Sequence, residues 1–275
     1  MNDTRPLGRI TISVLVALVL VVQLVPFYVT LTTALKPRTD RSSSWLFPQG
    51  EIAWENFATA IEDGHVLTAI MNTAIVTVVS TVLICVIAAA AAYPLARRTT
   101  IGNKMLLLGI VGLMMIPPLA TLVPLYTLLR DMGALNTYWG LILVMVAGGL
   151  PLAIFLYAAF MRSLPISMEE AARVDGASQI QVLWQIVVPT LKPVTATVII
   201  LSSVGVWNEF ALSNFILAKP DTRMIAPSIS TFFSASGSNF GAAAAASLLA
   251  VLPVLIAYLF LQRQFIAGMV AGSEK

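Results

Sequence analysis

The sequence predicts an all-α integral membrane protein with six membrane-spanning helices, and two observations support this fold class. Hydrophobic residues fill 58% of the 275 positions, charged residues fill only 11%, and the mean hydropathy is +0.89. Such a composition is too apolar for a water-soluble globule of this length. Five long runs contain no Asp, Glu, Lys or Arg, and a sixth contains a single acid. Each run has the roughly 20 residues that a helix needs to cross a hydrocarbon core of about 30 Å.

These runs give the expected spans in chain order. They cover residues 10–35, 66–96, 105–129, 132–161, 193–218 and 224–262, and the single acid is Glu209 in the fifth run. The first run is longer than the apolar region of a secretory signal peptide, so we expect a retained helix there. Between the first two runs, Trp54, Phe57 and Ile61 have helical spacing, which fits a short surface helix or a solvated loop with aromatic anchors.

Prolines and glycines predict where the spans deviate from straight helices. Pro94 should kink or end the second span, because proline removes a backbone donor and clashes with the preceding turn. Pro117-Pro118 in the third span, and Gly148-Gly149 with Pro151 in the fourth, predict backbone breaks near membrane depth. Freed carbonyls are costly in lipid, so such breaks are candidates for the lining of a pathway or gate. A packing kink is the alternative for each proline taken alone.

The basic residues indicate how the chain is oriented. With a cytoplasmic N-terminus, ten of the 16 Lys and Arg residues would lie inside and six outside, and the C-terminus would also be cytoplasmic. The net charge is +3, and the basic residues show no interleaved aromatics, so we expect no nucleic acid as a partner. His65 and Cys85 are each the only residue of their type, so we expect neither a disulfide framework nor a histidine-rich metal site.

Residues 163–189, between the fourth and fifth spans on the cytoplasmic side, have the pattern of a soluble two-helix unit. Ser167 to Glu170 and Ser178 to Gln181 each have the spacing of a capping box, and Gly176 occupies the position where a glycine ends a helix. The second helix should present one apolar face, formed by Ile180, Leu183, Trp184, Val187 and Val188. Pro189 ends the unit, and the fifth span follows.

The first of these two helices combines small residues with charges, and such a surface suits docking to a protein. The residues concerned are Glu169, Glu170, Ala171, Ala172, Arg173 and Asp175. A helix lying in the lipid headgroups would instead be rich in Lys and Arg on its polar face. Because this helix begins with two adjacent glutamates, we expect it to dock to a protein partner.

The same segment carries a family resemblance. Glu170-Ala171-Ala172, Gly176, Ile186 and Pro189 resemble the EAA loop of the membrane subunits of bacterial binding-protein-dependent ABC importers, with Val188 where the family usually has Leu. The resemblance extends to the flanks. The flanking segments are Ser163-Leu164-Pro165, Asn72-Thr73 and residues 207–210 (Trp-Asn-Glu-Phe). The C-terminal residues 262–268 with Ala271-Gly272 are similar to the tail of carbohydrate-importer permeases of the maltose-transporter second-subunit type.

The resemblance implies a type I ABC importer permease fold with a cytoplasmic coupling loop. It divides the chain into a first helix with an external segment (1–67), a transmembrane core (68–262) with the coupling loop at 163–189, and a cytoplasmic tail (263–275). It also implies a set of ATPase-coupling residues: Glu169, Glu170, Ala171, Ala172, Asp175, Gly176, Ile186 and Pro189. No catalytic residue is expected in this chain.

The implied assembly lies in a bacterial inner membrane. It contains a second homologous permease, two ATPase subunits that bind ATP and Mg, and an external solute-binding protein that delivers the substrate. The resemblance favours a di- or oligosaccharide as this substrate, and glycerol phosphodiesters or sugar phosphates are the alternatives. The chain contains no G-x-x-x-x-G-K-[ST] phosphate loop, so we expect it to bind no nucleotide cofactor itself.

Trp207, Asn208 and Glu209 lie at the outer end of the fifth span and are candidates for the translocation pathway or its gate, because an intramembrane acid is commonly functional. The alternative is that Glu209 only reaches the external interface. An ion-coupled secondary transporter is the alternative function, but it would need buried ionisable groups in several spans, and only Glu209 is available. An intramembrane hydrolase would need a Ser–His pair or metal ligands at depth, which the lone His65 does not supply.

Overall fold

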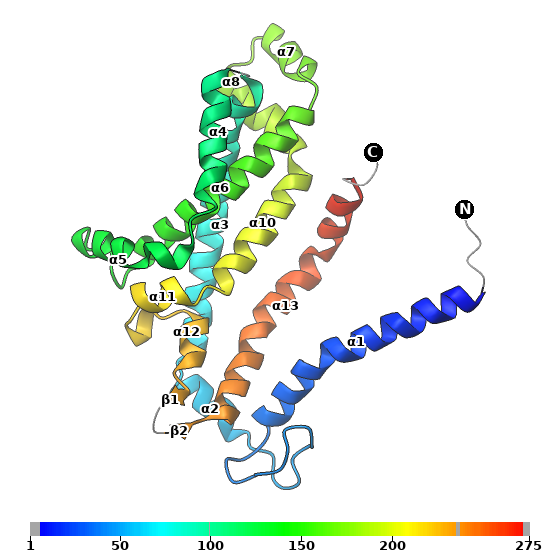
Figure 1. Cartoon of the computed structure of the whole chain (residues 1–275), viewed down its shortest axis with the longest axis vertical. Coiled ribbons are helices and arrows are strands. Elements are labelled where there is room, and N and C mark those ends of the chain that lie inside the picture. Colours follow the sequence, from blue (N-terminus) through cyan, green and yellow to red (C-terminus); the bar gives the residue numbers. More distant parts are fainter. Residues whose placement is uncertain (1–5, 99, 235–236, 272–275) are drawn as a thin grey trace. The chain divides into compact units, whose positions relative to one another are not determined.

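The computed structural model describes the backbone of residues 6–98, 100–234 and 237–271, and the side chains of residues 10–98, 100–233 and 238–259. The regular secondary structure of the described residues is helical apart from one pair of two-residue strands (Figure 1). It divides into two compact units. The first comprises Met1–Val66 with Ser228–Val254, and the second comprises Leu67–Pro227 with Leu255–Lys275.

Within the described residues, four helices are long and apolar enough to cross a membrane. They are Ile10–Ala34 in α1 (Pro6–Ala34), α3 (Val66–Arg97), α6 (Tyr138–Ser163) and Phe240–Leu259 in α13 (Phe240–Ala271). Two bent helix pairs also qualify. They are α4 (Ile101–Leu113) with Pro118–Asp131, bent by 90°, and Gln179–Thr190 with α10 (Lys192–Trp207), bent by 79°. If each bent pair is one span, the number of spans is the predicted six.

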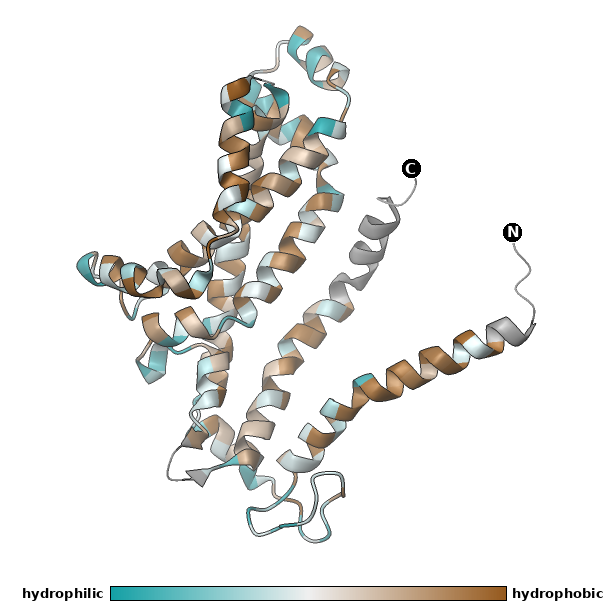
Figure 2. Cartoon of the chain, in the orientation of Figure 1, coloured by the Kyte–Doolittle hydropathy of each residue, from teal (hydrophilic) through white to brown (hydrophobic). Residues whose placement is uncertain are grey.

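The side chains of these helices are mostly apolar, as expected for helices that face lipid. Brown, apolar residues cover most of α1 and α6 in Figure 2, whereas teal, polar residues gather at α7. None of the side chains of residues 10–31 in α1 is buried within the chain. A helix that is apolar on all sides must lie in a membrane or against other protein.

The break predicted in the third span is present. Helix α4 ends at Leu113, and a 3-10 turn η1 (Pro118–Thr121) leads into α5 (Leu122–Asp131). The double proline explains the break, because Pro118 pushes Pro117 out of the helical region and neither residue has an N–H to donate. The φ and ψ of Pro117 are −63° and 127°, which is extended backbone.

The break predicted in the fourth span is wrong, because α6 continues through Gly148, Gly149 and Pro151. Gly149 instead lies where α6 packs against α3. A Cβ at this position would lie 2.5 Å from Cδ1 of Ile84 on α3. The missing side chain therefore lets α3 and α6 approach closely, which is how helices associate in lipid. The prediction for Pro94 is also wrong as a helix end, because α3 runs past it to Arg97.

The fifth and sixth spans are shorter than predicted. Helix α10 ends at Trp207, and α11 (Ala211–Ile216) is a separate helix. The backbone amide N–H of Ala242 donates to Oδ1 of Asn239 (3.1 Å), so α13 starts at residue 240 instead of 224. The preceding residues form η3 (Pro220–Thr222), α12 (Ile225–Ser230), β1 (Phe233–Ser234) and β2 (Gly237–Ser238), which pair antiparallel with Phe233 opposite Ser238. Polar residues at 228–239 therefore form the connection, not the span.

The first unit contains the predicted surface helix, α2 (Glu55–Glu62). The buried amide of Asn56 donates to the backbone oxygens of Ala34 (2.9 Å) and Lys36 (2.8 Å), so α2 is attached to the end of α1. A Cβ at Gly241, in the first turn of α13, would lie 2.6 Å from Nδ2 of Asn56. The backbone of α13 continues to Ala271, past the predicted start of a tail at residue 263, and residues 272–275 lie outside the described residues.

The second unit has two apolar cores. One joins α3, α6 and α10 to the segment α8 (Gln179–Gln181), η2 (Val182–Val187) and α9 (Val188–Thr190), and includes the buried Tyr157, Met161, Val182, Val187 and Leu191. The other joins α3, α5, α6 and α11, and includes Val76, Leu129, Leu141, Leu217 and Met224. Together they hold the two-helix segment and the outer loops on one scaffold.

Candidate functional site

The turn of the predicted coupling loop has the predicted local structure. Helix α7 (Ser167–Val174) is followed by Gly176 with a φ of +90°, a conformation that glycine adopts without strain. The hydroxyl of Ser178 accepts from the amide N–H of Gln181 (3.4 Å), and Oε1 of Gln181 accepts from the amide N–H of Ser178 (2.8 Å). This is the second predicted capping box, and it is confirmed.

The first predicted capping box is wrong. Ile166 precedes the helix with φ −69° and ψ −25°, which is helical backbone, and no side chain caps this end. An N-cap residue needs an extended backbone to aim its side chain at the next amides. Ser167 therefore lies inside the first turn, where its hydroxyl cannot cap, and Glu170 is free to point to solvent.

The second helix of the loop is wound differently from the predicted α-helix. After the short α8, residues 182–187 form a π-helix, and Val182 and Val187, five residues apart, are both fully buried. The wider turn changes the buried face, because residues at i and i+5 now lie on one side. Ile180, predicted to be on the inner face, is 72% exposed, and Trp184 is also exposed. Leu183 is buried as predicted.

The predicted coupling residues divide by exposure. Glu170, Ala171, Asp175, Gly176 and Pro189 are exposed, whereas Ala172 and Ile186 are half-buried. Glu169 is fully buried, so the prediction that its charge faces a partner is wrong. The exposed surface of α7 and its C-terminal end therefore carries Glu170, Ala171, Arg173, Val174 and Asp175.

Glu169 is bound to the C-terminal end of α3. Its Oε2 accepts a hydrogen bond from the hydroxyl of Tyr93 (2.7 Å), and its Oε1 accepts one from Nε of Arg97 (2.6 Å). Nη2 of Arg97 also lies 2.6 Å from Oε1, and Nη2 of Arg173 lies 3.8 Å from Oε2 and donates to the Tyr93 hydroxyl (3.1 Å). A buried carboxylate needs such partners, and sequence spacing could not show a contact between residues 72 and 76 positions apart.

A polar cavity of about 430 Å³ lies beside these charges. Three arginines line it, Arg97, Arg98 and Arg173, together with Glu169 and Gln179. The cavity joins the end of α3 to the coupling loop. Its three arginines outnumber its single acid, so its surface is basic.

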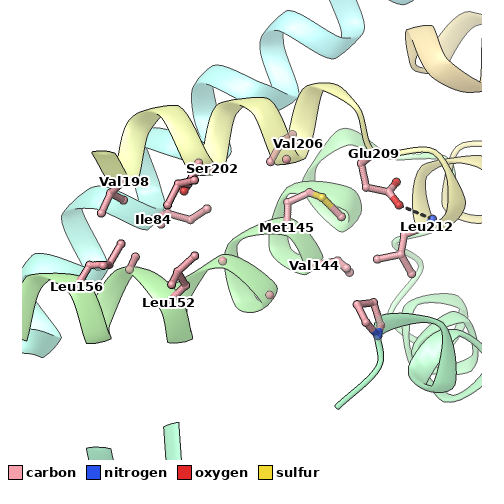
Figure 3. Close-up of a pocket in the computed structure, with 16 residues that line it drawn as sticks. Ile84, Val144, Met145, Leu152, Leu156, Val198, Ser202, Val206, Glu209 and Leu212 are labelled. Atoms are coloured by element: carbon pink, nitrogen blue, oxygen red, sulfur yellow. Dashed lines mark hydrogen bonds between the residues drawn. The ribbon is translucent and has the colours of Figure 1, made fainter. Parts of the chain in front are cut away.

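A second cavity, of about 400 Å³, lies between α3, α6 and α10 (Figure 3). Its wall is almost entirely apolar, with Ile84, Met145, Leu152 and Val198 among the lining residues. The polar side chains in the wall are Ser202 and Glu209. Gly148 and Gly149 also line it, so the two glycines meet the cavity without a helix break.

Of the three predicted pathway residues, only Glu209 lines this cavity. Its Oε1 accepts from the amide N–H of Leu212 (2.8 Å), shown by the dashed line in Figure 3, and its Oε2 accepts from that of Ser213 (2.7 Å). The carboxylate thus satisfies the first amides of α11. Nδ2 of the exposed Asn208 donates to the Val204 oxygen (2.9 Å), and Trp207 is half-buried. Ser202, the other polar residue in the cavity wall, was not predicted from the sequence.

Asn72 holds the loop that precedes α12 in this unit. Its amide donates to the backbone oxygens of Asp221 (2.9 Å) and Arg223 (2.9 Å), and its Oδ1 accepts from the hydroxyl of Tyr138 (2.8 Å). The hydroxyl of Thr73 accepts from the amide N–H of Ile225 (2.9 Å). Asn72-Thr73 therefore fastens the loop before α12 to α3 and α6.

Comparison with known proteins places this geometry in a family context. The family model described as "Binding-protein-dependent transport system inner membrane component" matches residues 82–270. The chain is 40% identical over 276 residues to the melibiose/raffinose/stachyose import permease protein MelC of Bacillus subtilis (strain 168), with both chains covered completely. It is 31% identical over 271 residues to the diacetylchitobiose uptake system permease protein DasC of Streptomyces coelicolor, with 98% of each chain covered.

One solved structure shares the fold. It is a bacterial ABC transporter involved in the import of the acidic polysaccharide alginate, and the match has a TM-score of 0.79 at 21% identity. The match covers 96% of this chain and 100% of that chain. The arrangement of helices described above is therefore one already seen in an ABC importer.

Proposed function

Because this chain belongs to the family of binding-protein-dependent transport system inner membrane components, we propose that it imports a di- or oligosaccharide as one permease of an ATP-driven complex. The family membership confirms the resemblance drawn from the EAA loop and makes the chain a multi-pass transport permease. The named relatives import or take up sugars of this size, which supports the choice of substrate class.

The observation that carries the proposed coupling role is the two-faced structure of residues 167–190. One face is buried on α3 and α6 through Glu169, Val182 and Val187. The other face leaves Glu170 and Asp175 exposed, together with Ala171, Arg173 and Val174. A rigid unit with a charged, small-residue surface suits the groove of an ATPase, where Glu170 would pair with a basic residue.

The rest of the proposed complex follows from what this chain lacks. ATP and Mg would be bound by two ATPase subunits, because the chain has no phosphate-binding loop of the G-x-x-x-x-G-K-[ST] type. A second homologous permease would complete the membrane part, and an external binding protein would deliver the sugar. Helix α4 has no buried residue among its described side chains, which suits contact with lipid or with that second permease.

The test is reconstitution of the complex with a charge reversal on the loop. Glu170→Lys should reduce ATPase co-purification and sugar uptake, because it opposes the proposed pairing with a basic residue. Asp131→Lys is the matched control, since Asp131 is an exposed acid on α5 outside the loop, with 62% of its side chain exposed. Full uptake and full stimulated ATPase activity in Glu170→Lys, or equal losses in both variants, would contradict the coupling role.

The proposed pathway includes the apolar cavity. Glu209, with Trp207 and Asn208 near it in the chain, would act at its outer end, and Ser202 would offer the other polar group on its wall. Glu209→Gln should raise the KM for sugar uptake, because one carboxylate oxygen becomes an amide that cannot accept from the α11 amides. Unchanged uptake kinetics at matched protein levels would show that Glu209 is a helix cap and nothing more.

The proposed location is a bacterial inner membrane with both chain ends in the cytoplasm. The excess of basic residues on that side supports this orientation. Reporter fusions after residues 98 and 133 test it, since the first should report the cytoplasm and the second the outer side. Opposite readings would require the reverse topology.

A further inference from the structure

The contact between α7 and α3 has a mechanical consequence. We propose that Glu169, Arg97 and Tyr93 form a joint through which movement of the coupling loop displaces α3 and so changes the apolar cavity. This inference rests on the proposed function, because it assumes that the loop is moved by an ATPase. It assigns positioning roles to three residues that contact neither substrate nor nucleotide.

The joint is strong because its charge is buried. Glu169 is fully buried, and its two carboxylate oxygens accept hydrogen bonds from the Tyr93 hydroxyl and from Nε of Arg97, whose Nη2 lies within ion-pair distance. Separating a buried ion pair leaves an uncompensated charge in a poorly solvated place. The loop therefore cannot move away from α3 without a large cost, and the two should move together.

The joint supplies a connection that the backbone does not. On one side, α7 is separated from α6 by Leu164, whose backbone is extended with ψ 136°. On the other side, the second helix of the loop meets α10 at a bend of 79°. Neither covalent connection is a continuous helix, whereas the contact of Glu169 with α3 is a direct side-chain link to a continuous helix.

Helix α3 connects this joint to the cavity wall. Ile84 lines the cavity, and Arg97 lies 13 positions further along the same helix. At a rise of 1.5 Å per residue, the distance between them along the helix axis is roughly 20 Å. Ile84 also packs against Gly149 of α6, where there is no room for a methyl group. A shift of α3 must therefore change the contact that closes this side of the cavity.

The test measures uptake per ATP hydrolysed in the reconstituted complex. Glu169→Gln and Arg97→Gln should each lower this ratio on the order of tenfold, within the usual range of coupling between sites. The double variant should lose no more than either single variant, because both remove the same link. Arg97→Lys, which keeps the charge, should recover part of the ratio. Unchanged ratios in both single variants, or losses that multiply in the double variant, would overturn the joint.

Two further variants separate the joint from simple loss of stability and from failure of the proposed function. Tyr157→Phe removes the hydrogen bond between the Tyr157 hydroxyl and Thr195 (3.1 Å) and should leave the ratio unchanged, even if the thermal midpoint falls. If Glu170→Lys uncouples transport while Glu169→Gln and Arg97→Gln do not, the joint is refuted and the proposed function stands. If no variant, wild type included, assembles with an ATPase, the proposed function itself fails.

If the two charge variants do not fold, Tyr93→Phe provides the same test with a smaller change. It removes the 2.7 Å hydrogen bond to Glu169 and keeps the buried ring. We expect a smaller fall in uptake per ATP, with ATP hydrolysis retained. No change in the ratio for Tyr93→Phe would count against the joint.

Discussion

Adding one methyl group at Gly149 should loosen the contact between α3 and α6. A Cβ there would lie 2.5 Å from Cδ1 and 3.2 Å from Cγ1 of Ile84. Ile84 is only 1% exposed, and it would have to move by about 1 Å to restore van der Waals contact. Overpacking of this kind costs about 1–3 kcal/mol, against a gain of up to about 1 kcal/mol for replacing glycine in a helix.

Gly148→Ala is the matched control. Gly148 lies on the same helix as Gly149, and a Cβ at Gly148 would have no neighbouring atom within 4 Å. We expect the unfolding midpoint of Gly149→Ala to lie below that of Gly148→Ala by roughly 2–4 °C for each kcal/mol of difference. Thermal unfolding in detergent at one scan rate gives the comparison.

The rescue variant Ile84→Val removes Cδ1. It should recover part of the loss in the Gly149→Ala background, although on its own it costs about 0.5–1.5 kcal/mol. Equal midpoints for the two glycine variants would refute the packing argument. If Ile84→Val does not raise the unfolding midpoint of Gly149→Ala, the Cδ1 methyl group of Ile84 is not the group that clashes with the added Cβ.

Three other predictions concern the outer loops and the coupling turn. Gly140→Ala should destabilise the chain by more than about 2 kcal/mol, because its Cβ would collide with the backbone oxygen of Ala134, which cannot rotate away, and thermal unfolding measures this. Asn72→Ala should cost about 1–3 kcal/mol and speed proteolysis near residue 222, since two backbone carbonyls and the Tyr138 hydroxyl lose their partner; an unchanged cleavage rate would contradict this. Gly176→Asn should retain more uptake than Gly176→Val, because asparagine tolerates a positive φ and valine does not, and uptake by vesicles compares them.

The general fold could be predicted because lipid imposes a strong rule on sequence. Every span must be a long apolar helix with its backbone bonds satisfied internally, so the six runs and the double proline at 117–118 were sufficient to indicate the fold class. The loop turn was equally predictable. Gly176 and the Ser178–Gln181 box act through atoms within a few residues of each other, and local chemistry decides them.

The extents of spans five and six were less predictable, because hydropathy does not record where a helix is capped. Glu209 looked like an acid within a span, yet its carboxylate accepts from the amides of α11 and so begins a new helix. Asn239 likewise accepts from an amide of α13. A run without charges can therefore include turns whose polar side chains satisfy the backbone.

The sequence alone determined which segments cross the membrane, which segment is polar, and which family motif it carries, since each depends on composition or on short spacing. Only the tertiary structure decided that Glu169 faces inward to Tyr93 and Arg97, that Gly149 meets Ile84, and that the cavity lies where α3, α6 and α10 meet. The contacts of Glu169 and Gly149 join residues more than 60 positions apart. They depend on how helices pack side by side, and the periodicity of one helix does not specify its neighbour.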